Sequence, residues 1–227
     1  MAAASVDYFS DGRFILGMGT SHKVQVEPEH GLEFTRPVQR LRECVDVVRG
    51  ILRDSDVTYT GEIYNIDHFD LWFEPLRKEI PIYVAAVFPK MLEVCGEISQ
   101  GAILTWCTLD HAATAARHVA IGAHNAGRSP DDVEVTSLLP CAVSDNREEA
   151  RDLMRQPIAS YAGRFPRYRR LMVDAGFPDE LRSAFGPFIK QVLLSGDAVA
   201  VRSAPLRPVA GEGGQIDCCK NESDESC

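Results

Sequence analysis

The residues most able to bind a ligand follow a short apolar strand near the start of the chain. A turn at Ser10–Gly12 leads into a strand predicted over Arg13–Gly17, which ends in the sequence Gly-Met-Gly-Thr-Ser-His at 17–22. Small residues after a buried parallel strand let the backbone approach a ligand closely. This glycine-rich loop is therefore the first candidate site.

The spacing Gly17-x-Gly19-x-x-His22 is close to a dinucleotide-binding fingerprint. That fingerprint requires a third glycine and a helix directly after the loop. Here a histidine stands at the third position, and the apolar pattern predicts no helix between this loop and about Pro37. A Rossmann-type nucleotide site is therefore not expected.

Histidine and cysteine do not form a recognisable metal site. The chain has 7 cysteines and 6 histidines, and no cysteine pair has zinc-ligand spacing. Three cysteines crowd the C-terminal tail (Cys218, Cys219 and Cys227), where a metal or redox role stays open. His111 and His118 are spaced for one helix face but have no carboxylate at suitable spacing. No metal is expected.

The elements that must position the glycine-rich loop alternate between strand and helix patterns, which predicts a parallel α/β fold. Helices are expected to begin at Pro37, Pro89 and Arg147, and an alanine-rich helix ends at Gly127. Residues 157–194 are helical in pattern, with breaks at Pro166, Gly176 and Pro187, and Thr58–Glu74 is an aromatic, β-rich excursion. With Arg13–Gly17, the four recognisable strands include Ile80–Val87, Gly101–Trp106 and a strand within Val133–Val143.

Composition narrows the classes of protein. The 227 residues carry a formal net charge of -9 and no basic stripe, which argues against a nucleic-acid partner. No run of about 20 apolar residues and no signal-peptide pattern are present, so a cytoplasmic protein without membrane contact is expected. Periodicity ends after Ser203, and the acidic composition of the tail predicts disorder. We expect one domain over residues 1–202 and a disordered, cysteine-containing tail over 203–227.

Several segments together resemble the luciferase-like monooxygenase family, and within it the branch of coenzyme F420-dependent oxidoreductases that includes methylenetetrahydromethanopterin reductase. The similarity covers about Ala4 to Arg202. The segments that carry it are GRFILGMGTSH at 12–22, RPVQRLRECVDVVRGIL at 36–52, TGEIYNI at 60–66, IPIYVAAVFPKMLEVCGEISQGAILTW at 80–106, AGRSPDDVEV at 126–135 and YRRLMVDAGFPDE at 168–180.

The resemblance implies a partial (β/α)8 TIM barrel of the luciferase-like type. On the family's pattern, the strand at Arg13–Gly17 is similar to the fourth barrel strand, and the later three are similar to the fifth, sixth and seventh. Ala2–Ser10 then corresponds to the end of the preceding helix. Because three units before it and a recognisable eighth strand are missing, the chain is expected to be truncated at both ends.

The resemblance also implies the site. In the family, the cofactor ring lies at the barrel mouth and its phosphate in the loops after the fifth and sixth strands. His22 would transfer a proton to the substrate. Small residues and the helix start at Pro89 would offer backbone N–H groups to the phosphate, although Val87 and Phe88 stand where many relatives have glycine. The implied cofactor-binding residues are Gly19, Thr20, Ser21, Ala85, Ala86, Val87, Thr105 and Trp106.

The implied function is hydride transfer between a reduced deazaflavin, coenzyme F420, and a small organic substrate, with FMN as the alternative cofactor. Two other hypotheses stay open. In the first, the chain is a catalytically inactive fragment of a barrel; in the second, it is a half-barrel that a partner chain completes. Both arise because half a barrel leaves two unpaired strand edges. Family members commonly dimerise, so a homodimer is also open.

Overall fold

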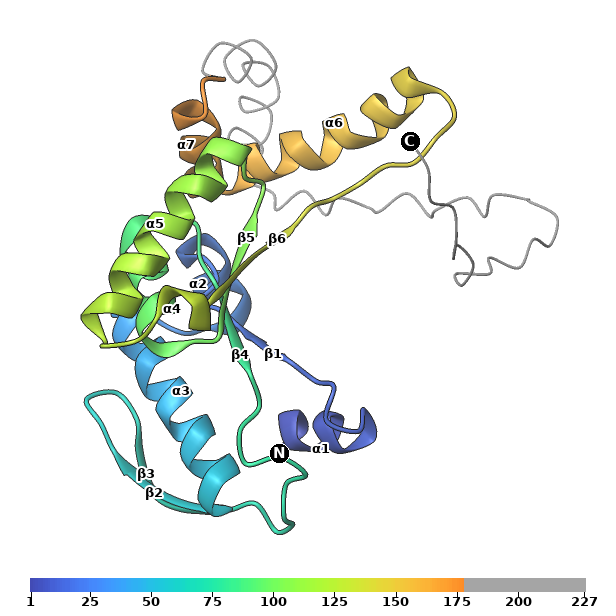
Figure 1. Ribbon diagram of the computed structural model, residues 1–227. Helices are drawn as coiled ribbons and strands as arrows, with labels where there is room; N and C mark the ends of the chain where they lie inside the picture. The colour runs from blue at the N-terminus through green and yellow to red at the C-terminus, as the bar shows by residue number, and fades with distance from the viewer. Residues whose placement is uncertain (178–227) are drawn as a thin grey trace, which may run out of the picture. The chain divides into compact units, whose positions relative to one another are not determined.

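The structure is a computed structural model that describes residues 1–177 (Figure 1). The predicted domain boundary at 202 and 203, the break at Pro187 and the three tail cysteines lie outside these residues.

A parallel four-stranded sheet forms the centre of the described residues. Its strands lie in the order β1-β4-β5-β6, so β1 and β6 are the two edges. Leu16 pairs with Ile82, Tyr83 with Gly101, and Gly101 with Glu134. All four predicted strands are therefore confirmed, and within residues 1–177 the sheet does not close into a barrel. The strands are β1 (Leu16–Met18), β4 (Ile82–Ala85), β5 (Gly101–Thr105) and β6 (Glu134–Leu138).

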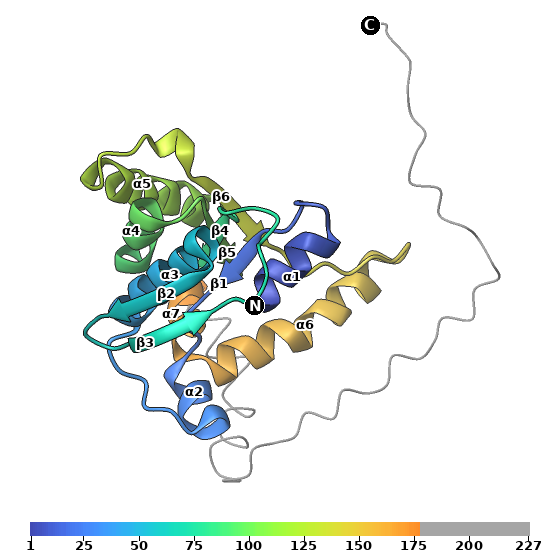
Figure 2. The same ribbon diagram turned by 90° about the horizontal axis from the view of Figure 1, so that it is seen from below.

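Three helices pack on one face of this sheet (Figures 1 and 2). They are α3 (Pro37–Asp54), α4 (Pro89–Ile98) and α5 (Leu109–Asn125), followed by a short 3-10 helix, η1 (Pro130–Asp132). Proline begins α3 and α4, where its missing N–H costs no hydrogen bond, as the sequence predicts. Their apolar stripes meet Ile82, Val84 and Leu104 in one buried core.

Helices α4 and α5 approach each other closely because two glycines face the contact. A Cβ added at Gly122 would lie 1.8 Å from the carbonyl oxygen of Glu93, and one at Gly96 would lie 2.0 Å from that of Val119. Neither position tolerates a side chain at this separation. The sequence pattern did not single out these glycines, since both stand inside ordinary helical segments.

The excursion predicted at Thr58–Glu74 is an antiparallel hairpin of β2 (Asp56–Thr60) and β3 (Asn65–Asp70). It is held to α3 by the buried carboxylate of Glu43, which accepts hydrogen bonds of 2.9–3.0 Å from the backbone N–H groups of residues 62–64. Burial alone would raise the pKa of Glu43, but these bonds and one from Gln39 lower it to about 2. Glu43 therefore stays ionised and ties the turn of the hairpin to the helix.

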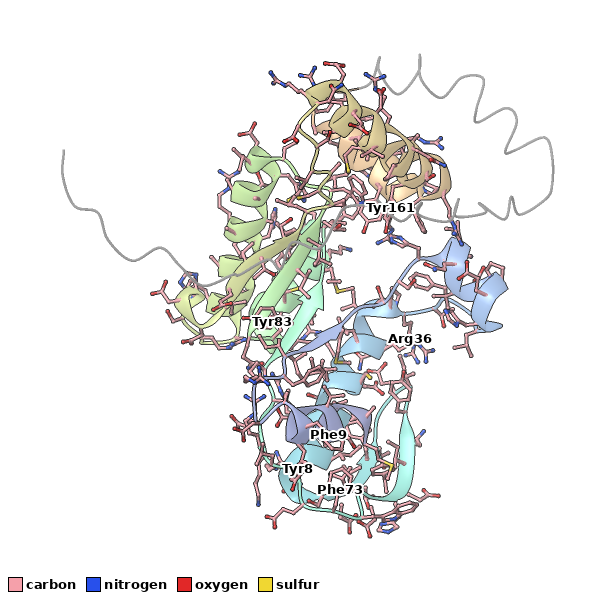
Figure 3. All side chains as sticks on the ribbon, turned by 90° about the vertical axis from the view of Figure 1, so that its right-hand side faces the viewer. Tyr8, Phe9, Arg36, Phe73, Tyr83 and Tyr161 are labelled. Carbon is pink, nitrogen blue, oxygen red and sulfur yellow. The ribbon has the colours of Figure 1, made fainter. Side chains whose placement is uncertain are left out.

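Helix α1 (Ala2–Phe9) is anchored by a buried ion pair. Asp7 is fully buried, and Arg77 donates to its Oδ1 at 2.5 Å and to the carbonyl oxygen of Phe14 at 2.6 Å. The other face of α1 is open to solvent at Tyr8 and Phe9 (Figure 3). The helix predicted at the start of the chain is thus present.

One helix was not expected. Helix α2 (Lys23–His30) follows the glycine-rich loop, so the prediction of no helix before Pro37 is wrong. None of its residues is buried, and Pro28 lies inside it, so the segment carries no apolar periodicity to detect.

The C-terminal part of the described chain is helical, as predicted. Helix α6 (Arg147–Arg164) continues through Pro157, and α7 (Pro166–Asp174) begins at the predicted break and ends before Gly176, whose φ is +93°. Within residues 1–177, no helix is both long enough and apolar enough to cross a membrane.

Candidate active site

A cavity of about 300 Å³ lies where strands β1, β4 and β5 end. Seven of the nine site residues predicted from the sequence line it: Thr20, Ser21, His22, Ala85, Ala86, Val87 and Thr105. They come from three separate segments, which the parallel register brings to the same edge of the sheet. The remaining lining residues are Gln25, Phe88, Met91, Ile103, Tyr161, Phe165, Arg167 and Tyr168.

The ends of β1 and β4 are kept open by small residues. A Cβ added at Gly19 would lie 3.1 Å from the Cβ of Ala85, so glycine is the residue that fits this gap without a shift. Gly19 itself lines a neighbouring cavity rather than this one. The small side chains leave backbone and ring-sized surface accessible at the strand ends.

Backbone donors at the start of α4 are free to bind an anion. The N–H groups of Val87, Phe88 and Lys90 find no acceptor among residues 1–177, and no side chain caps this helix. Unpaired N–H groups and the positive end of the helix dipole favour phosphate. This part of the site therefore fits the phosphate of a flavin or deazaflavin, despite the absence of glycine at Val87 and Phe88.

His22 sits at the boundary between β1 and α2. It is the residue before the first turn of α2, with extended backbone at φ -127° and ψ 143°. Its ring centroid lies 4.7 Å from that of Phe165 and 5.2 Å from that of Tyr168. Burial, with a smaller contribution from the charge of Arg167, lowers the pKa of His22. The imidazole is therefore neutral at neutral pH.

The loop before His22 is conformationally constrained. Ser21 has a φ of +55°, a region that costs a non-glycine residue about 1–3 kcal/mol. Its hydroxyl donates to the side-chain oxygen of Gln25 at 3.2 Å. This bond ties the loop to the first turn of α2 and fixes the entry of His22 into the cavity.

An aromatic wall from α6 and α7 was missed in the sequence. Tyr161, Phe165 and Tyr168 pack against one another with centroids 5.3–6.0 Å apart. Figure 3 shows Tyr161 at the end of α6 that is nearest the sheet. Their spacing of four and then three residues is a helical stripe that could have revealed them, although the break at Pro166 interrupts it.

Trp106 does not line the cavity. Its ring packs against Tyr161 at 5.0 Å, behind the aromatic wall, and its φ is +53°. The indole thus packs against the aromatic wall. Trp106 was predicted to contact a cofactor, but it is not among the residues that line the cavity.

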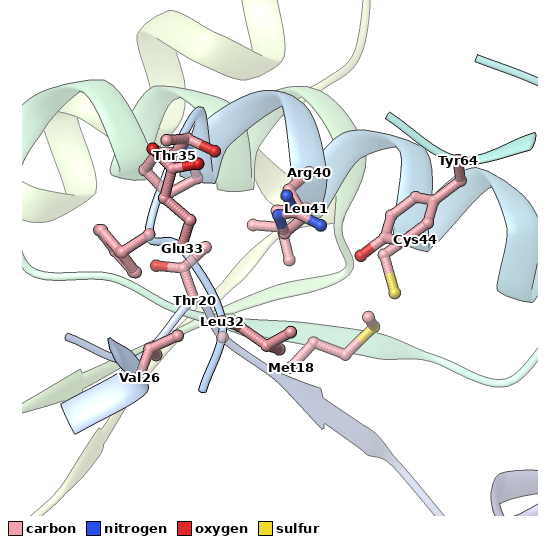
Figure 4. A pocket seen from close by; sticks show the side chains of 13 residues that line it. Met18, Thr20, Val26, Leu32, Glu33, Thr35, Arg40, Leu41, Cys44 and Tyr64 are labelled. Carbon is pink, nitrogen blue, oxygen red and sulfur yellow. The ribbon is translucent and has the colours of Figure 1, made fainter. Parts of the chain in front are cut away.

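Gly19 and Thr20 also border a second cavity of about 330 Å³ between β1 and α3 (Figure 4). Met18, Cys44 and Tyr64 come together there, and the guanidinium of Arg40 lies 5.6 Å from the ring centroid of Tyr64. None of the sheet's other strand ends reaches this cavity. The cavity that His22 lines is therefore the candidate active site.

The predicted histidine pair on α5 does not form a site. His118 pairs with Glu93 at 3.0 Å, whereas the buried Nε2 atom of His111 finds no hydrogen-bond partner within the described residues 1–177. Within residues 1–177, no group of three histidine, cysteine, aspartate or glutamate side chains is placed to hold a metal ion.

The fold and the position of the cavity indicate the class of protein. Parallel α/β folds bind ligands beyond the carboxyl ends of their strands, where this cavity lies. The structure of coenzyme F420-dependent tetrahydromethanopterin reductase from Methanopyrus kandleri has the same fold. It aligns with a TM-score of 0.68 and 23% identity over 85% of this chain and 57% of the reductase. The fold is α/β of the luciferase-like TIM-barrel type, represented here by four parallel strands.

The family follows from the sequence comparison. Residues 1–191 match the family model described as luciferase-like monooxygenase, and the chain belongs to that family. It is 30% identical to 5,10-methylenetetrahydromethanopterin reductase of Archaeoglobus fulgidus over 158 residues, which are 70% of this chain and 47% of the relative. The reductase of Methanolobus tindarius is 28% identical over 155 residues, or 68% and 47%. The chain spans about half the length of the curated relatives it matches.

Proposed function

We propose that this chain is the cofactor-binding part of a coenzyme F420-dependent oxidoreductase that transfers hydride between the reduced deazaflavin and a small organic substrate. The observation that carries the proposal is the cavity, which collects predicted residues from three strand ends beside free backbone donors. The named relatives support F420, and FMN is the alternative cofactor.

Each part of the cavity has a role in this proposal. The N–H groups of Val87, Phe88 and Lys90 hold the phosphate, and Ala85 and Ala86 leave room for the ring. When bound, the cofactor supplies the hydride chemistry. His22 moves the proton that accompanies hydride transfer, since its neutral imidazole lies within the cavity rather than in bulk water. The aromatic wall excludes water from the reacting atoms.

The test is a fluorescence titration of the chain with F420 and, separately, with FMN. We expect saturable binding of one cofactor. Ala85 is exposed at the cavity, so Ala85→Phe fills the space without disturbing the core and weakens binding by about tenfold or more. Ala113, exposed on α5 and outside the cavity lining, offers the matched control Ala113→Phe, which leaves binding unchanged.

Two outcomes contradict the proposal. Equal binding by the wild type and Ala85→Phe would place the cofactor elsewhere. Failure of a folded chain to bind either cofactor would favour the other hypotheses, a catalytically inactive fragment or a half-barrel that requires a partner chain. The edges of β1 and β6, which have no strand partner within residues 1–177, favour the second of these hypotheses.

A further inference from the structure

Within residues 1–177, one guanidinium at the cavity has no ion-pair or hydrogen-bond partner. Four arginines lie between residues 164 and 170, and three of them are engaged: Arg164 with Glu29, Arg169 with the carbonyl oxygens of Ala162 and Gly163, and Arg170 with Asp174. Arg167 makes no ion pair and no hydrogen bond within residues 1–177. It lies with its Cζ 5.9 Å from the ring centroid of Phe88, at the wall of the cavity.

The charged side chain that lines the described part of the cavity is positive. Among the lining residues that the structure describes, Arg167 is the single permanently charged side chain, and no aspartate or glutamate is present. A guanidinium that is not neutralised by the protein attracts an acid group of a ligand, and its planar fork matches a carboxylate or phosphate. The cavity is therefore complementary to an anion at this end.

The aromatic side chains that line the cavity favour a flat molecule. The rings of Phe165 and Tyr168 lie against the imidazole of His22 and are each only 8% exposed, and Tyr161 packs against both of these rings. Aromatic faces gain about 0.5–1.5 kcal/mol per favourable ring pair beyond the burial of area. A planar, unsaturated group fits this wall better than a branched or hydrated one.

We propose that the substrate of this site is a planar organic acid, whose ring or conjugated system lies against Tyr161 and Phe165 and whose acid group is bound by Arg167. That this acid is a substrate rests on the proposed oxidoreductase function. That the cavity binds a planar acid does not depend on that function. Arg167 then determines specificity by charge, and His22 lies beside the bound molecule.

This arrangement couples binding to protonation. The titratable or charged groups that face His22 in the cavity are Arg167, Tyr161 and Tyr168, and Arg167 opposes protonation of the imidazole. Burial is the larger cause of the lowered pKa of His22, and the charge of Arg167 is the smaller one. An acid bound to Arg167 offsets this smaller cause and thereby acts to raise the pKa of His22.

The experiment measures binding of benzoate and of its neutral counterpart benzamide to the full chain without cofactor, by calorimetry. The imidazole signal of His22 is followed by NMR, assigned with His22→Gln. We expect benzoate to bind about tenfold more tightly than benzamide and to raise the pKa of His22. Arg167→Met abolishes both effects. Arg170→Met, on the same helix but paired with Asp174 outside the cavity, preserves both.

Other outcomes overturn the inference. Equal affinity for benzoate and benzamide, no binding of benzoate, or a preference that persists in Arg167→Met would each show that Arg167 does not bind the acid. Displacement of benzoate by FMN but not by riboflavin would assign Arg167 to the cofactor phosphate. If neither cofactor binds while the benzoate preference holds, the proposed function fails and the acid site stands.

Discussion

Replacing Gly122 with alanine tests whether the close approach of α4 and α5 stabilises the fold. Alanine is the better helix former by about 1 kcal/mol, so propensity alone predicts a gain in stability. The structure predicts the opposite, because the new Cβ would lie 1.8 Å from the carbonyl oxygen of Glu93. A backbone atom cannot rotate away from this overlap as a flexible side chain could.

The expected loss of stability follows from how far α4 and α5 must move apart to accommodate the new Cβ. Ordinary contact with a Cβ begins at 3.4 Å, so the two helices must separate by about 1.6 Å. A gap of about 0.5–1 Å already forfeits a quarter to a half of the dispersion energy of each atom pair. Strain and lost packing together cost about 3–5 kcal/mol. After the gain in helix propensity, the net loss is about 2–4 kcal/mol, or on the order of 10 °C in Tm.

Thermal unfolding followed by circular dichroism measures this loss. Ala116→Gly, on the exposed face of α5, is the control that isolates helix propensity and costs about 1 kcal/mol. Gly96→Ala strains the same interface, so the double variant loses less than the two single losses combined. A Tm for Gly122→Ala equal to or above that of the wild type would refute the reasoning.

Three further predictions concern stability. Asp7→Ala leaves Arg77 unpaired and costs about 2–4 kcal/mol by urea unfolding, less than for a fully buried pair because the Arg77 side chain is 31% exposed; an unchanged midpoint would contradict this. The lowered pKa of Glu43, about 2, means that its contribution is complete above about pH 4.5 and is lost as the pH falls toward 2, so the Tm gap between wild type and Glu43→Gln must narrow over that window. Thr108→Ala removes the acceptor for the N–H of His111 and costs about 1 kcal/mol, checked by the same unfolding assay against wild type.

The sequence predicted the elements that carry a strong local pattern. The four strands are apolar runs that end in small residues, and α3 and α4 begin at proline, so both the strands and the helix starts could be found. Helix α2 could not, because no face of it is buried and it has no apolar stripe. The same reasoning explains why the loop and strand-end residues Thr20–His22 and Ala85–Val87 could be predicted to lie at one edge of the sheet, where they line one cavity. Their types and their place after parallel strands are local properties.

The sequence by itself determined that this is a parallel α/β chain of the luciferase-like family, and it predicted a candidate site at the ends of the strands. Only the tertiary structure decided which side chains meet there. Phe165 and Tyr168 are about 140 positions beyond His22 in the sequence, and nothing local specifies that their rings pack against its imidazole. Likewise, the unpaired state of Arg167 and the buried carboxylate of Glu43 depend on partners brought by folding, because charge and burial are properties of surroundings rather than of residue type.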